Sequence, residues 1–157
     1  VAAETPFYGE SGGQVGDRGV IETADGALIE VTDTLKPRPD LIVHVGTVVR
    51  GAVRTGQTAR LRVDRERREA TRLNHSVTHI LHGVLRRTLG EHVRQAGSLV
   101  APDRLRFDFT QPLPIDAAAL DRIEEEVNAH IRENAEVTTE TMAYDDAIKA
   151  GALAFFG

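Results

Sequence analysis

The sequence contains no cysteine, which excludes disulfide bonds and leaves nothing that points to export. It also lacks any apolar run of the roughly 18 residues that a membrane-spanning helix needs. Hydrophobic residues make up 41% and charged residues 27%, which is typical of a globular protein rather than a disordered chain. With 157 residues the chain is long enough to bury a core, in one domain or in two small ones. We expect a globular protein in the cytoplasm.

Two familiar catalytic motifs are also missing. The glycine-rich run TPFYGESGGQVGDRG (residues 5–19) contains no Gly-Lys-Ser/Thr, so it is not a phosphate-binding P-loop. The run NHSVTHILH (residues 74–82) contains His-x-x-x-His, but Ser76 stands where zinc metalloproteases carry their glutamate base. The sequence therefore excludes both of these enzyme classes.

Charge is unevenly distributed along the chain. The net charge is −5, yet residues 50–106 hold thirteen arginines against five acidic residues. That segment alone has a balance of +8, and the remainder has −13. A concentrated basic segment is typical of a protein that binds a phosphate-rich partner. The alternative is a solvated surface on which the arginines pair with neighbouring acids.

The first 63 residues have the pattern of β-strands. Three runs alternate apolar and polar residues: ALIEVTDTL (27–35), LIVHVGTVV (41–49) and TARLRVD (58–64). Glycines separate the runs, and KPRPD (36–40) is expected to be a loop. Short strands at this spacing predict a small β-barrel over residues 1–63.

The pattern changes to helix at Asp64, a residue suited to an N-cap. Helical spacing continues to Gly90, with an apolar stripe of Leu73, Val77, Ile80, Leu81, Val84 and Leu85. Strand character returns in SLVAPDRLRFDFT (98–110) and in AEVTTETM (135–142). A second amphipathic helix, with the stripe Leu120, Ile123, Val127 and Ile131, lies between them, and YDDAIKAG (144–151) predicts a short helix. We expect an α+β fold with a domain over residues 64–157, an antiparallel sheet packed with helices.

His75, His79 and His82 fall on one side of the predicted helix, away from the apolar stripe. His-x-x-x-His places two imidazoles where both can reach one zinc ion. The same residues would also suit a polar helix face in water. Spacing alone leaves both interpretations open.

Taken together, TPFYGESGGQVGDRG and NHSVTHILHGVLRRTLGEHVRQAGSLVAPDRLRFDF closely resemble the editing region of the alanine–tRNA ligase (alanyl-tRNA synthetase) family. The resemblance extends to AIKAGALAFFG at the end of the chain. It implies hydrolysis of the ester in tRNA(Ala) mischarged with Ser or Gly. It also implies that attachment of alanine, with ATP and Mg²⁺, belongs to a part of the ligase outside this chain.

The resemblance also implies roles for individual residues. His75 and His79 match zinc ligands, whereas the family's later Cys-x-x-x-His pair has no counterpart here, so the zinc site is expected to be incomplete. Thr78 and Gln95 match catalytic positions. Substrate binding is expected to involve Gly12, Gly13 and Arg106.

Two other functions stay open alongside the editing domain: a free-standing editing hydrolase and a tRNA-binding module without catalysis. The chain begins at Val1 and ends on the apolar run GALAFFG, so we expect a piece of a longer protein, truncated within its second domain.

Overall fold

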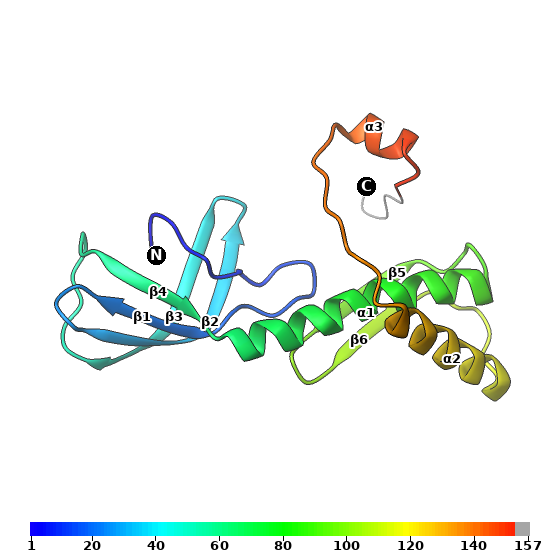
Figure 1. Ribbon diagram of the computed structural model, residues 1–157, viewed down its shortest axis with the longest axis horizontal. Coiled ribbons are helices and arrows are strands. Elements are labelled where there is room, and N and C mark those ends of the chain that lie inside the picture. Colours follow the sequence, from blue (N-terminus) through cyan, green and yellow to red (C-terminus); the bar gives the residue numbers. More distant parts are fainter. Residues whose placement is uncertain (153–157) are drawn as a thin grey trace. The chain divides into compact units, whose positions relative to one another are not determined.

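The computed structural model describes residues 1–152, which form two compact units. Unit 1 comprises residues 1–78 and 97–107, and unit 2 comprises residues 79–96 and those from 108 onward. Figure 1 labels the elements, which are β1 (Gly19–Thr23), β2 (Leu28–Arg38), β3 (Leu41–Arg50), β4 (Ala59–Val63), α1 (Arg65–Leu89), β5 (Gln95–Val100), β6 (Leu105–Phe109), α2 (Ala117–Glu133) and α3 (Tyr144–Lys149). The units divide within α1. The sequence-based domains, 1–63 and 64–157, stay a prediction.

Unit 1 contains a four-stranded antiparallel sheet in the order β3-β2-β1-β4. Ile21 of the central strand β1 pairs with Ile29 on one side and with Leu61 on the other. Because side chains alternate between the faces of a strand, these registers place apolar residues together on one face. The core beneath consists of Phe7, Ile21 and Val31.

The closed barrel predicted for residues 1–63 is not confirmed. The sheet is open, with β3 and β4 at its edges in the described part of the chain. A barrel closes only with enough strands to surround its side chains, and about eight are usual. The glycine-rich segment could have supplied another strand, but residues 5–18 form turns and isolated bridges instead. β2 also continues through Pro37 to Arg38, so the predicted loop shrinks to a tight turn.

Helix α1 begins and ends as the sequence predicts. The Asp64 side chain accepts a hydrogen bond from the backbone N–H of Arg67 at 3.0 Å, which caps the first turn. Gly90 follows the last turn with a φ of 119°, a conformation that favours glycine.

The buried side of α1 differs from the predicted stripe. Val84 and Leu85 are buried, but Leu73 is 69% exposed. His82 and Thr78, which the sequence placed off the stripe, are 8% and 7% exposed. Within unit 1, glycine-rich residues pack against this polar side of α1, as the hydrogen bonds of His75 and Arg68 show.

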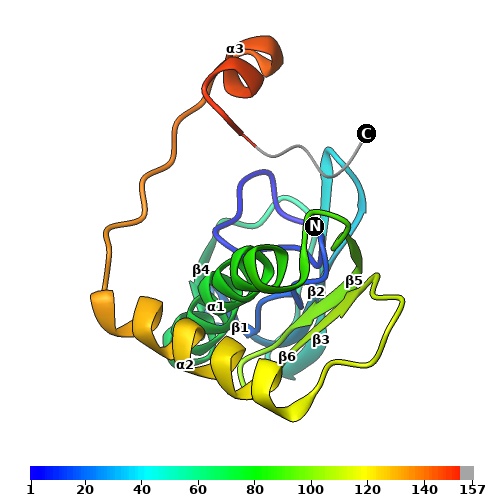
Figure 2. The same cartoon turned by 90° about the vertical axis from the view of Figure 1, so that its right-hand side faces the viewer.

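The second half of the chain confirms the α+β class. Strands β5 and β6 form a two-stranded hairpin (Figure 2). Helix α2 is capped by Asp116, whose carboxylate accepts from the N–H of Ala119 at 2.7 Å, and it ends at Asn134 in the left-handed conformation. Its buried residues are Ala119 and Ile123, whereas Leu120 is 51% exposed. The predicted stripe is therefore confirmed at Ile123 but not at Leu120, where the neighbouring Ala119 is buried instead.

The strand predicted over residues 135–142 is wrong. These residues carry no regular secondary structure and all are exposed. A strand needs a partner for its backbone groups, and none of the described strands pairs with this segment. The short helix predicted after it is confirmed as α3. Residues 153–157, which form most of the apolar end noted above, lie outside the described residues. No helix within residues 1–152 is long and apolar enough to cross a membrane.

Candidate functional site

The double glycine forms a tight turn at the tip of the glycine-rich segment. Ser11 and Gln14 exchange two backbone hydrogen bonds, 3.2 and 3.0 Å long, around Gly12 and Gly13. The φ angles of the two glycines are 58° and 84°. A two-residue hairpin turn with positive φ at both central positions favours glycine at each, because a side chain there is strained. The sequence Ser-Gly-Gly-Gln therefore specifies its own turn, which we call the glycine turn (residues 11–14).

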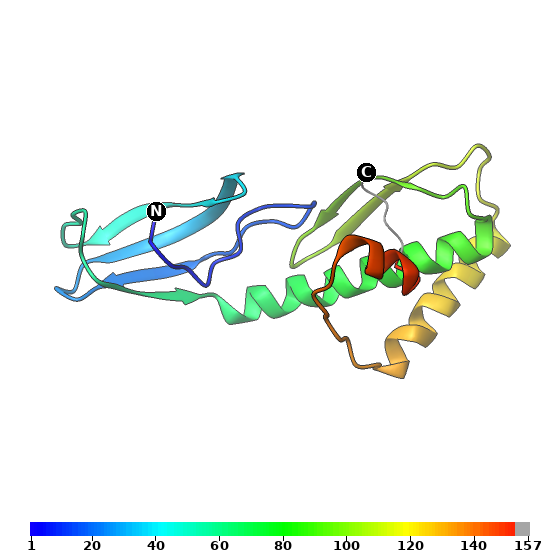
Figure 3. The same ribbon diagram turned by 90° about the horizontal axis from the view of Figure 1, so that it is seen from above.

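Strand β5 lies beside the glycine turn and is hydrogen-bonded to it (Figure 3). The N–H of Val100 donates to the carbonyl of Gly13 at 2.8 Å, and the N–H of Val15 donates to the carbonyl of Val100 at 3.0 Å. Ser98, two residues earlier on β5, donates its hydroxyl to the carbonyl of Gly12 at 3.4 Å. The backbones approach so closely that a Cβ on Gly13 would lie 2.2 Å from Ser98 Oγ. Only glycine fits here.

The glycine turn also contacts α1 directly. We call α1 the histidine helix, because it carries His75, His79 and His82. Gln14 is 7% exposed, and its Oε1 lies 2.5 Å from Nδ1 of His75 on α1. His75 itself is half-buried. This hydrogen bond joins residues 61 positions apart, so two motifs that the sequence analysis connected only by resemblance meet in unit 1.

A buried ion pair fixes the other end of the glycine-rich segment. Asp17 is 7% exposed and accepts from Nε of Arg68 at 2.8 Å and from the backbone N–H of Tyr8 at 2.5 Å. Its second oxygen makes an ion pair with Arg68. The hydrogen bond to Asp17 raises the pKa of the Arg68 guanidinium above its ordinary value, against the opposing effect of burial. The segment is thus attached to α1 at two points.

Thr78 and Asn74 complete this side of α1. Asn74 Nδ2 donates to the carbonyl of Ala101 at 2.7 Å, just beyond the end of β5. Thr78, 7% exposed, donates its hydroxyl to the carbonyl of Asn74 at 2.8 Å. Because the hydroxyl hydrogen of Thr78 is used in that bond, the side chain can only accept a further hydrogen bond, through its oxygen lone pairs.

The other predicted site residues lie elsewhere. His79 is exposed on α1, four residues after His75, so the predicted spacing is kept. Gln95 is the half-buried first residue of β5, and it belongs with His79 to unit 2. Arg106 is exposed on β6 in unit 1. Among the predicted site residues, the structure thus links the turn of Gly12 and Gly13 to His75, through Gln14.

The described residues do not complete a zinc site. The imidazoles of His75 and His79 have the right chemistry, and Nδ1 of His75 already bonds to Gln14, which leaves Nε2 as the nitrogen for a metal. Within residues 1–152, no three His, Asp or Glu side chains gather closely enough to hold a metal ion. Zinc takes three or four protein ligands, so this chain fits only part of such a site.

Many arginines of the basic segment are paired with acids. Ion pairs join Arg50 and Arg62 to Glu22, Arg87 to Glu126 and Arg104 to Asp103. The alternative of a solvated, self-paired surface therefore accounts for part of the positive charge. Arg54, Arg60 and Arg65 are exposed as well, so the segment also presents positive charge to the solvent.

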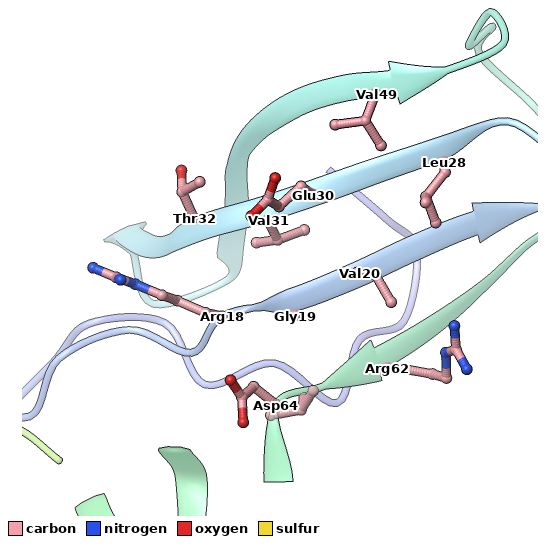
Figure 4. A pocket seen from close by; sticks show the side chains of 11 residues that line it. Arg18, Gly19, Val20, Leu28, Glu30, Val31, Thr32, Val49, Arg62 and Asp64 are labelled. Carbon is pink, nitrogen blue, oxygen red and sulfur yellow. The ribbon is translucent and has the colours of Figure 1, made fainter. Parts of the chain in front are cut away.

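A separate pocket of about 740 Å³ lies on the four-stranded sheet (Figure 4). Its lining mixes apolar strand residues, such as Val20 and Leu28, with Arg18, Arg62 and Glu30. It contains none of the predicted site residues in its described lining. We do not assign the chemistry of the histidine helix to it.

Sequence reasoning missed Gln14, Ser98 and Asn74. A signal for Gln14 was present, since it directly follows the double glycine and closes the glycine turn. Ser98 and Asn74 gave no such signal, because a serine in a strand and an asparagine in a helix are common surface residues.

A comparison with known protein families first indicates the broad class to which the chain is similar. The sequence profile of the family described as "tRNA synthetases class II (A)" matches residues 1–67. That match covers β1 to β4, the glycine turn and the first residues of α1.

The particular family follows from individual relatives. The alanine–tRNA ligase of Parvibaculum lavamentivorans is 53% identical over all 157 residues, and that of Methylococcus capsulatus is 57% identical over the same span. The ligase of Rhizorhabdus wittichii is also 57% identical over the whole chain. The chain belongs to the alanine–tRNA ligase family, as the resemblance predicted. It spans 18% of the length of each of these relatives.

Proposed function

We propose that this chain forms part of the editing site of an alanine–tRNA ligase, which hydrolyses the ester of tRNA(Ala) mischarged with Ser or Gly. The observation that carries the proposal is the hydrogen bond between Gln14 and His75. It joins the glycine turn to the histidine helix, the two motifs on which the resemblance to the editing region rests. Membership of the ligase family supports the same conclusion.

An alanine-specific ligase needs such an activity for a physical reason. Loss of one methyl group costs only about 1–3 kcal/mol of binding, so an alanine pocket rejects glycine weakly. An added hydroxyl is rejected only about a hundredfold in such a pocket, so serine also enters. Serine is larger than alanine and glycine is smaller. Size cannot remove both, and a second site must recognise the misattached residue chemically.

The reaction is a simple hydrolysis. Water adds to the ester carbonyl, the bond between the carbonyl carbon and the ribose oxygen breaks, and the amino acid and tRNA leave separately. Thr78 offers hydroxyl lone pairs to the serine hydroxyl or to water, and Gln95 offers an amide. Gly12 and Gly13 bring backbone close to the substrate without side chains, and Arg106 offers charge to the tRNA. These roles are part of the proposal.

Zinc enters the proposal through His75 and His79 as two ligands. In the resembled family the remaining ligands are a Cys-x-x-x-His pair, which this sequence does not contain. We propose that the site is completed outside this chain. When bound, zinc supplies positive charge that anchors the substrate or polarises water.

The test uses the full-length ligase that carries this sequence. We expect it to hydrolyse Ser-tRNA(Ala) and to spare Ala-tRNA(Ala). His75→Ala should abolish the hydrolysis and lower the zinc content, whereas alanine attachment in the separate domain should continue. His130→Ala, which removes a half-buried histidine of α2 that lies beside Glu126 and Glu133, is the control and should leave hydrolysis intact.

The competing function is a tRNA-binding module without catalysis. It predicts that Ser-tRNA(Ala) binds but persists. If the unaltered ligase binds the mischarged tRNA and does not hydrolyse it, the editing proposal is wrong and the binding module is the better account.

A further inference from the structure

We propose that Gln14 is a positioning residue that selects the ring tautomer of His75 and so makes Nε2 the lone-pair nitrogen of this histidine. The significance of Nε2 for editing rests on the proposed function. The tautomer itself rests only on the geometry of unit 1.

The argument begins with the chemistry of the two groups. The atom of Gln14 that faces the ring is Oε1, 2.5 Å from Nδ1 of His75. A carbonyl oxygen only accepts hydrogen bonds, so Nδ1 must carry the hydrogen. A neutral imidazole has one N–H and one lone pair, which places the lone pair on Nε2.

The orientation of the Gln14 side chain is supported from the backbone. Gln14 is 7% exposed, and its own N–H and carbonyl bond to Ser11. The residues on either side, Gly13 and Val15, bond to Val100 of β5. Since the backbone is fixed on both sides and the side chain is buried, the amide has little freedom to leave the ring. A glutamine held in this way acts on the histidine as a fixed acceptor.

A defined tautomer matters because only the lone-pair nitrogen can take a proton from water or bind a cation. A histidine that exchanges between tautomers presents that lone pair at a given position for only part of the time. Gln14 removes this exchange. The residue after the double glycine therefore has a function of its own, distinct from the close backbone approach of Gly12 and Gly13.

A second histidine–glutamine pair in the same chain, His92 and Gln111, predicts the opposite tautomer and serves as an internal reference. In unit 2, Gln111 Oε1 lies 2.7 Å from Nε2 of His92. The same reasoning assigns the hydrogen of His92 to Nε2 and its lone pair to Nδ1. His75 and His92 should thus differ in tautomer, each under the control of its own glutamine.

The experiment is ¹⁵N NMR of the imidazole nitrogens in the labelled chain, at a pH at which the rings are neutral. In the unaltered chain we expect a protonated Nδ1 and a lone-pair Nε2 for His75. Gln14→Leu should remove this preference, and the Nε2 signal should move toward that of a protonated nitrogen. Gln111→Leu is the matched control, which should alter His92 and leave His75 unchanged.

A conservative variant separates positioning from folding. Gln14→Glu keeps an acceptor oxygen next to Nδ1, so it should retain the wild-type tautomer of His75 even if Gln14→Leu fails to fold. A protonated Nε2 on His75 in the unaltered chain overturns the proposal, as this would mean that the glutamine presents its NH₂ group. Wild-type His75 signals in folded Gln14→Leu also overturn it. The expected tautomer without hydrolysis of Ser-tRNA(Ala) would contradict only the editing function.

Discussion

Gly12 and Gly13 occupy the same turn but differ in the space around them. A Cβ on Gly12 would meet no atom within 4 Å, whereas a Cβ on Gly13 would lie 2.2 Å from Ser98 Oγ and 2.7 Å from the Ser98 carbonyl oxygen. Both substitutions place a side chain at positive φ, which costs about 1–2 kcal/mol. We expect Gly13→Ala to cost about 1–3 kcal/mol more than Gly12→Ala, because the clash involves backbone.

Urea unfolding of the two alanine variants measures this difference in the free energy of unfolding. Each variant serves as the control for the other, since both carry the same added methyl group in the same turn. Equal losses would mean that β5 and the glycine turn are not in the close contact described here.

His44 gives the fold a dependence on pH. Its Nε2 lies 2.8 Å from Thr5 Oγ1, and its ring makes an edge contact with Phe7, the centroids being 5.0 Å apart. Burial lowers the pKa of His44 below its ordinary value of 6.5. The unfolded state then binds the proton more readily than the folded state does.

The stability that neutral His44 contributes is therefore present above about pH 6.5 and is lost as the pH falls from there through the folded-state pKa. Unfolding free energies measured from pH 8 down to about pH 5 should decrease, and His44→Gln should reduce that decrease. If the pH dependence of the His44→Gln variant matches that of the unaltered chain, this histidine is not the responsible group.

At the level of single residues, the sequence allowed prediction of some site features but not of their contacts. Gly12, Gly13 and His75 were predicted, and they lie close together. Gln14 connects the glycine turn to His75 and Ser98 binds the turn to β5, and both residue types are ordinary on a surface. The arrangement depends on the pairing of β5 with the glycine turn. These two segments are far apart in the sequence, and their pairing leaves no periodic pattern in it.

Among the elements, α2 depends on its cap. The carboxylate of Asp116 accepts the N–H of Ala119 at 2.7 Å. Asp116→Ala should lower the free energy of unfolding by about 1 kcal/mol, because a backbone N–H of the first turn loses its partner. Asp116→Asn keeps an acceptor at the same place and is the matched control. The measurement is the thermal unfolding midpoint. If the alanine and asparagine variants have the same midpoint, the cap contributes nothing to the stability of the protein.

Helix boundaries could be predicted because capping residues are local signals. Asp64 and Gly90 act through the backbone of the next or preceding turn, and both stand where the sequence placed them. Buried faces could not be predicted as well. Leu73 is exposed and His82 is buried because the neighbouring segments, and not the helix itself, decide which side is covered.

The two errors in strand prediction have a common origin. Residues 135–142 alternate like a strand but have no partner among the described strands, and residues 1–63 form a sheet with too few strands to close. Alternation reports that a segment is compatible with a sheet. Pairing and closure depend on the other strands, which a local pattern does not contain.

For the whole molecule, the proposed tRNA partner implies sensitivity to salt. Each phosphate contact releases counterions, so the logarithm of the binding constant should fall linearly with the logarithm of salt concentration. In the full-length ligase, Arg106→Gln should lower that slope by about 0.7–0.9 if Arg106 contacts a phosphate. Arg104→Gln is a suitable control, since Arg104 lies two residues away and is paired with Asp103. Identical slopes for both variants and the parent would remove Arg106 from the tRNA contact.

The most direct test of the editing account compares two threonines of α1. Thr71 and Thr78 are 4% and 7% exposed, and each donates its hydroxyl to the carbonyl four residues earlier, at 2.9 and 2.8 Å. Replacement of either by valine removes the same helix hydrogen bond and changes the shape little, but only Thr78 is proposed to act on the substrate. The measurement is single-turnover hydrolysis of Ser-tRNA(Ala) by the full-length ligase. We predict a loss of about a hundredfold for Thr78→Val, typical for one preorganised polar group, and the wild-type rate for Thr71→Val. Equal rates for the two variants would contradict the account.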